Sequence, residues 1–135
     1  GDTSSTDNID KFSFSSDGNS TDFGSLSTSG RRPFATNSKY YGYACGGGSS
    51  VNIIEKFAFA TGGSVTDVGD LTVNRTYASS QSSTTHGYVS GGYSGSYTSA
   101  IDQHSFETDG NATEVGNLAS PRSGSTFAEA TGQQV

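Results

Sequence analysis

Apolar and polar residues follow one order three times along this chain. Residues 9–14, 54–59 and 101–106 each begin with Ile and an acidic residue and end with Phe, which places the copies 45 and then 47 residues apart. Within the first copy, Phe12 and Phe14 alternate with polar residues, as the two-residue period of a strand requires. No stretch of about ten residues spaces its apolar side chains as a helix would. The pattern therefore predicts an all-β chain with almost no helix.

A second signature follows each copy. Residues 21–26, 66–71 and 113–118 have the order Thr, acid, apolar, Gly, polar, Leu, and an Arg comes about four residues later at Arg75 and Arg122, and at position 31 or 32 in the first copy. A period this long in a chain rich in Gly, Ser and Tyr is typical of stacked copies of one β unit. We expect a single repeat domain over 1–135, with repeats at approximately 1–47, 48–92 and 93–135.

Each repeat divides into four short strands, expected at 75–82, 85–90, 101–107 and 113–118 in the second of the two full copies. Between the last two strands, 108–111 has an Asp-Gly step, and 16–19 has the same step in the first copy. Asp-Gly tolerates the positive φ angles of a type I′ turn, so these positions predict tight hairpins. The middle copy has Gly-Gly at this place.

Composition supports an ordered chain and excludes two classes of partner. Hydrophobic residues are only 30% of the chain, but the net charge is a modest −6 and the sparse apolar residues keep their register. With a pI near 4.5 there is no basic surface for nucleic acid. No apolar run approaches the roughly 20 residues of a membrane span, and no signal-peptide core is present. We expect no membrane insertion. A first residue other than Met suggests a processed or excised piece of a longer protein.

Four antiparallel strands in about 45 residues, with a glycine pair after the second and an aromatic third strand, resemble the kelch repeat of β-propellers. The residues that carry this resemblance are Tyr43 and Tyr88, the pairs Gly46, Gly47 and Gly91, Gly92, the strand residues Phe14, Phe59 and Phe106, and Arg75 and Arg122. The resemblance implies kelch-like blades in which the glycines let neighbouring blades approach closely. The chain departs from the family by having Phe23, Val68 and Val115 where a Trp is usual in the fourth strand.

The wording of the repeats is also similar to low-complexity repeats of bacteriophage structural and tail-fibre proteins. That similarity implies a virion or extracellular location, and an acidic, Ser- and Gly-rich composition suits a protein that stays soluble there. The partners it implies are further copies of the chain or other virion and appendage proteins.

The expected strands number eleven, the last of them a lone first strand over 122–130. Propellers close with about 4–8 blades, so fewer than three blades cannot close alone. Three arrangements remain open: a segment of a longer propeller, two copies in a six-bladed ring, or an open array. Exposed terminal strands favour assembly in each case.

Catalysis finds little support because candidate side chains are scattered along the chain. His86, His104, Tyr41, Tyr43 and Cys45 include the residue types of a copper oxidase site, but both histidines have a simple structural role, because His86 precedes a Gly-Tyr strand and His104 replaces a repeat Phe. Cys45 is expected to be a small buried apolar residue. The acidic residues of the second signature lack the dense spacing of a calcium loop. We expect no enzyme activity, no metal and no cofactor.

Tyrosines in polar loops are the best candidates for ligand contact, because rigid aromatic rings beside Ser and Gly are typical of recognition surfaces. We select Tyr41, Tyr93 and Tyr97, with the loop 91–97 foremost, and surface glycans as a candidate ligand. Glycosylation sequons at Asn19, Asn74 and Asn111 remain open, since turn chemistry alone explains Asn at two of them. Two functions follow: a structural repeat protein that self-associates, or a carbohydrate- or receptor-binding adhesion module.

Overall fold

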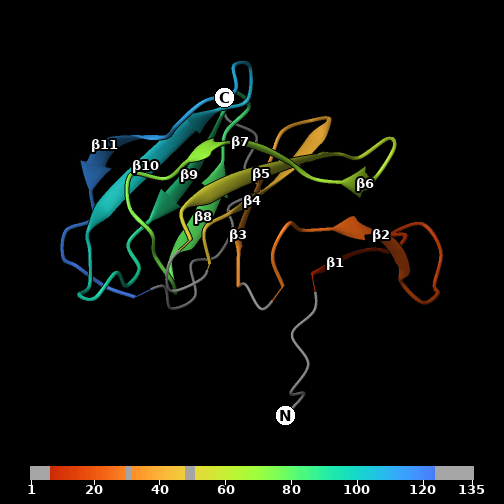
Figure 1. Ribbon diagram of the computed structural model, residues 1–135, viewed down its shortest axis with the longest axis horizontal. Helices are drawn as coiled ribbons and strands as arrows, with labels where there is room; N and C mark the ends of the chain where they lie inside the picture. Colours follow the sequence, from red (N-terminus) through yellow and green to blue (C-terminus); the bar gives the residue numbers. More distant parts are fainter. Residues whose placement is uncertain (1–6, 30–31, 48–50, 124–135) are drawn as a thin grey trace, which may run out of the picture.

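The chain is an all-β protein, as the sequence predicts. The computed structural model describes residues 7–29, 32–47 and 51–123, which form eleven strands and no helix (Figure 1). The strands are β1 (Asn8–Lys11), β2 (Thr21–Ser25), β3 (Phe34–Asn37), β4 (Tyr41–Cys45), β5 (Ile53–Ala58), β6 (Gly63–Ser64), β7 (Thr66–Asp70), β8 (Ser79–Ser82), β9 (His86–Ser90), β10 (Ala100–Ser105) and β11 (Thr113–Asn117).

Three sheets follow one another in sequence order across the molecule (Figure 1). The N-terminal sheet has the order β1-β2-β6, the middle sheet β3-β4-β5-β7, and the C-terminal sheet β8-β9-β10-β11. In the middle and C-terminal sheets all neighbours are antiparallel, whereas β6 pairs with β2 in parallel. The described residues contain two four-stranded meanders and one smaller sheet, and these do not close into a ring.

Strand positions agree with the sequence except at two places, the start of the expected first strand and the third strand of the first copy. In the first copy β1 ends at Lys11, so Phe12 and Phe14 lie beyond the strand on which they were expected to alternate. Residues 75–78 are not part of β8, because they form the end of a connector that packs between the middle and C-terminal sheets. The described residues contain eleven strands, the expected number, but not the expected set. The short strand β6 was not expected, and the lone strand expected over 122–130 lies mostly outside the described residues.

The type I′ turns predicted at Asp17-Gly18 and Asp109-Gly110 are wrong, whereas Gly62 and Gly63 of the middle copy have φ angles of 61° and 91°, the sign that such a turn needs. Such a turn needs positive φ at both central residues, and Tyr77 is the one non-glycine residue with positive φ in the described part of the chain, so Asp17 and Asp109 do not adopt it. The hairpins themselves form, with connections over 12–20 and 106–112. The second of these loops contacts the middle sheet through Asp109, which lies 2.8 Å from Lys56 Nζ.

One irregularity recurs at the same place in all three sheets. The pairing register shifts between Ile9 and Asp10, between Ile54 and Glu55, and between Ile101 and Asp102, immediately before the acidic residue of the repeated segment. A bulge re-aims the side chains that follow it. In the middle and C-terminal sheets the acidic side chain after the bulge is buried, at 0% and 1% exposure.

The core lies between the middle and C-terminal sheets. It consists of Phe34, Tyr43, Cys45, Ile54, Leu71, Val89 and Ala112, with Val68, Ala78 and Phe106 packed against it. Along β10 every second residue is buried, namely Ala100, Asp102 and His104, as the alternating pattern predicts. Burial of apolar area at this junction provides the main driving force for joining the two meanders.

Candidate functional site: the junctions between sheets and the tyrosine surfaces

The connector between β7 and β8 folds back against the glycine pair that follows β4. Gly46 and Gly47 have φ angles of 53° and 98°, which glycine adopts without a side-chain clash. The Gly47 amide donates a hydrogen bond to the Arg75 carbonyl at 3.2 Å, and a Cβ on Gly46 would lie 3.1 Å from the Leu71 side chain. The glycine pair thus lets the connector lie directly against the sheet.

The C-terminal sheet repeats this arrangement. Gly91 and Gly92 have φ angles of 66° and 104°, and the Gly92 amide donates to the Arg122 carbonyl at 2.9 Å. A Cβ on Gly91 would lie 3.1 Å from the Leu118 side chain. Arg122 therefore occupies the same place after the C-terminal sheet that Arg75 occupies after the middle sheet.

A buried ion pair ties the connector to the C-terminal sheet. Arg75 Nη2 lies 2.9 Å from Asp102 Oδ2, and both side chains are 0% exposed. Arg75 Nη1 also donates to the carbonyls of Gly91 and Ala100, and the Asp102 carboxylate accepts from the amide and hydroxyl of Thr72 at 2.8–2.9 Å. Charges removed from water in this way need nearly complete hydrogen bonding. The pair fixes the connector and third strand relative to each other.

Aromatic rings fill the adjacent part of the same junction. The Tyr43 ring of β4 stacks on Phe106 at 5.0 Å between centroids and lies 5.1 Å from the His104 ring. Thr36 Oγ1 lies 2.9 Å from His104 Nε2, and burial lowers the pKa of His104 to about 4. The imidazole is therefore neutral at pH 7, and it belongs to the packing between sheets.

The three repeats carry the same aromatic pair with different neighbours. The two rings meet edge to face in each case, at 5.3 Å for Phe12 with Phe14, 5.9 Å for Phe57 with Phe59, and 5.4 Å for His104 with Phe106. Phe106 packs against the core, but Phe59 is 39% exposed and Phe14 is 95% exposed. The exposure of the three pairs differs because a neighbouring sheet covers each pair to a different extent.

The outer strand of the middle sheet meets the loop between β10 and β11 of the C-terminal sheet through backbone. Gly69 of β7 lies against the Gly110 carbonyl so closely that a Cβ would not fit. Beside it, the Asp70 amide donates to Asn111 Oδ1 at 3.1 Å, and the Ala112 amide donates to the Asp70 carbonyl at 2.7 Å. The glycine in the fourth strand is required by this close approach.

The N-terminal and middle sheets meet in the same manner. Gly24 pairs with Gly63, the counterparts of the two glycines at the next junction, and again no Cβ would fit at the first of them. The Ser27 amide donates to the Glu55 carboxylate at 2.9 Å. One repeat later, the Thr72 amide donates to the Asp102 carboxylate in the same way. One mode of contact therefore joins successive sheets twice.

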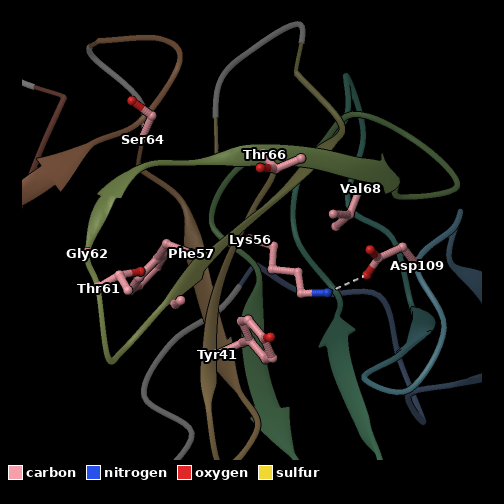
Figure 2. A pocket seen from close by; sticks show the side chains of 10 residues that line it. Tyr41, Lys56, Phe57, Thr61, Gly62, Ser64, Thr66, Val68 and Asp109 are labelled. Atoms are coloured by element: carbon pink, nitrogen blue, oxygen red, sulfur yellow. Dashed lines mark hydrogen bonds and ion pairs between the residues drawn. The ribbon is translucent and has the colours of Figure 1, made fainter.

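Tyr41, the first predicted contact residue, lines a pocket of about 270 Å³ at the edge of the middle sheet (Figure 2). The Lys56 ammonium lies 4.6 Å from the Tyr41 ring centroid and 2.8 Å from Asp109 Oδ1, and the hydrogen bond to this carboxylate raises the pKa of Lys56. The remaining lining comes from Phe57, Ala58, Thr61, Gly62, Ser64, Thr66 and Val68. The pocket offers an aromatic ring, a cation and a carboxylate to a polar ligand.

The other two predicted contact residues form a separate surface. Tyr93 and Tyr97 pair through their backbones in the loop after β9, and their rings meet edge to face at 5.5 Å while remaining 42% and 59% exposed. Tyr41 begins β4, whereas these tyrosines follow the end of the equivalent strand. The predicted contact residues thus lie at two opposite ends of the sheets.

The side chains considered for metal binding have local roles. Cys45 is fully buried, 3.8 Å from His104 Nε2, while His86 is hydrogen-bonded to Thr85. The carboxylates of Asp22 and Asp67 accept the amide of the glycine two residues later. In the part of the chain that the structure describes, no group of three or more His, Cys, Asp or Glu side chains could hold a metal ion.

Sequence reasoning missed the pairing of Arg75 with Asp102. The signal was present, since an acid recurs second in the repeated segment and an Arg recurs after the second signature. Alternation along the third strand identifies the buried face that carries Asp102, but the partner lies in a connector that the strand pattern does not pair with it. Two opposite charges repeating at fixed positions in a weakly charged chain would have suggested a buried pair.

Comparison with known proteins does not place this chain in a family: no family model matches it, and no curated protein matches its sequence. Across residues 7–29, 32–47 and 51–123, no helical segment has the length and hydrophobicity that a bilayer crossing needs. The candidate site is therefore defined by its own geometry.

Proposed function

We propose that this chain is a non-enzymatic structural repeat protein whose kelch-like propeller blades stack on further copies of the same unit. Two four-stranded antiparallel meanders in sequence, each with a glycine pair after its second strand, support the blade architecture. The observation that carries the proposal is the contact between sheets, which recurs with equivalent residues at both junctions. A contact that joins successive sheets twice within one chain can also join the chain to a further copy of the same unit.

A virion or extracellular location belongs to the same proposal. It is supported by the similarity to phage tail-fibre repeats, by the net charge of −6, and by the Gly- and Ser-rich composition. Exposed apolar rings such as Phe12 and Phe14 on the N-terminal sheet further favour partners in an assembly.

Light scattering coupled to size exclusion, followed by electron microscopy of the purified chain without ligand, tests this function. Oligomers in which four-stranded sheets stack around or along an axis are expected. A chain that remains monomeric up to about millimolar concentration would refute assembly as its role.

The alternative is a carbohydrate- or receptor-binding module. The pocket at Tyr41 favours it, because sugars combine an apolar face for stacking with hydroxyls that Lys56 and Asp109 could bond. Glycan-array binding by the wild type that is lost in Tyr41→Ala, and retained in Tyr40→Ala as the matched control, would support this function. Binding lost only in a Tyr93→Ala, Tyr97→Ala double variant would place it at the other tyrosine surface.

A further inference from the structure

The two ends of the described chain carry the two separated halves of the junction that joins the sheets internally. At the internal junction, Arg75 extends from a connector and Asp102 receives it on a third strand. Arg122 occupies the connector position after the C-terminal sheet, and Asp10 occupies the third-strand position, after the same bulge, in the N-terminal sheet. Both of these charged side chains are exposed.

The backbone on the Arg122 side already has the geometry of the internal junction, and Asp10 shares with Asp102 the bulge that precedes it. Arg122 is held by the Gly92 amide as Arg75 is held by the Gly47 amide, and its guanidinium bonds to Ser120 two residues earlier. Asp10 accepts a 3.4 Å hydrogen bond from Ser20. Opposite charges in equivalent positions at the two ends make these surfaces complementary.

The aromatic part of the junction is divided in the same way. Tyr88 of β9 is the counterpart of Tyr43, and its hydroxyl accepts a hydrogen bond from Gln103 at 2.8 Å while its ring is half-buried. Phe12 and Phe14 are the counterparts of the rings that Tyr43 covers, and they are 61% and 95% exposed. They also line an apolar groove of about 440 Å³. An uncovered aromatic pair and a half-covered tyrosine thus lie at opposite ends of the molecule.

The outer edge completes the correspondence. Gly116 of β11 is the counterpart of Gly69, and Gly18 and Asn19 are the counterparts of Gly110 and Asn111. A Cβ on Gly116 or on Gly18 would meet no atom within 4 Å, in contrast to the closed contact at Gly69. The glycine in the fourth strand is therefore retained where nothing among the described residues requires it.

We propose that a second copy of this chain docks head to tail, with Arg122 of one copy forming a buried ion pair with Asp10 of the next. In the same contact Tyr88 covers Phe12 and Phe14, and Gly116 lies against the turn at Gly18. This inference rests on the proposed function and gives it a partner and a register. Because the two surfaces differ, the contact is heterologous and repeats from copy to copy in a ring or a filament.

Sedimentation velocity over a range of concentrations, with charge-reversal variants, tests the pairing. Arg122→Glu places two carboxylates together and Asp10→Arg places two guanidiniums together, so each variant alone is expected to weaken self-association about 100-fold or more. An equimolar mixture of the two variants restores an opposite pair at every junction and is expected to associate like the wild type. The double variant Asp10→Arg, Arg122→Glu is expected to do the same.

Matched controls reverse exposed charges away from both surfaces: Lys39→Glu for the first variant and Glu107→Arg for the second. Circular dichroism should show that every variant folds like the wild type, since the altered side chains are exposed. Association of the single variants equal to that of the wild type would overturn the pairing while leaving the assembly function intact. A wild type that does not associate at all would overturn both.

Discussion

Removing the charge of Asp102 should destabilise the protein far more than removing any surface charge. In Asp102→Asn the shape of the side chain is kept, but the Arg75 guanidinium, 0% exposed and 2.9 Å from the lost charge, is left with neutral acceptors alone. A buried charge deprived of its partner costs about 3–5 kcal/mol. Domains of this size are stable by about 5–15 kcal/mol in total, so the variant should keep only part of its stability.

Urea unfolding followed by circular dichroism measures the effect. With an m-value of about 1.5 kcal/mol/M, the midpoint should fall by about 2–3 M. The matched control is Asp109→Asn, which breaks the exposed pair with Lys56 and should cost no more than about 1 kcal/mol. The double variant Arg75→Met, Asp102→Leu should recover most of the loss, because an apolar pair avoids the desolvation of both charges. Equal losses for Asp102→Asn and Asp109→Asn would refute the reasoning.

Two further predictions concern the same junction. His104 has a pKa of about 4 when folded and an ordinary value of 6.5, so its contribution is fully present above pH 6.5 and is lost as the pH falls toward 4, by about 3 kcal/mol in all. His104→Phe should abolish that part of the pH dependence in urea titrations, and an unchanged slope would contradict the assignment. Gly69→Ala should cost about 1–3 kcal/mol because its Cβ meets the Gly110 backbone, whereas Gly116→Ala should change the thermal stability of the monomer by less than about 0.5 kcal/mol. Similar melting shifts for the two alanine variants would show that the backbone contact is not tight.

The sequence predicts the strands well because their pattern is local. Alternation along 101–106 and the Thr-acid-apolar-Gly signature place β10 and β11 to within two residues. The repeat period also indicates which strands pair, since neighbours in sequence pair within each meander. These features depend on short-range sterics and side-chain periodicity, which each segment carries by itself.

Features that depend on a neighbouring sheet could not be predicted in this way. Phe14, Phe59 and Phe106 are the same residue in the same local pattern, yet their exposure ranges from 95% to partly buried according to what covers them. The loop at Asp109 forms no type I′ turn, and its local Asp-Gly pattern does not indicate that the carboxylate binds Lys56 of another sheet. Likewise Tyr41 and Tyr93 look alike in sequence but lie on separate surfaces.

Arg75 pairs with a residue that comes later in the sequence, and this order has a consequence for synthesis on the ribosome. The cation is translated with the connector, but the carboxylate that neutralises it belongs to β10, which emerges later. Until then the middle sheet can form its own hydrogen bonds, but its connector cannot settle into a dry environment without leaving a charge unneutralised. The connector after each completed sheet should therefore stay solvated until the following sheet has been synthesised. The chain then acquires its tertiary order from the N-terminus onward.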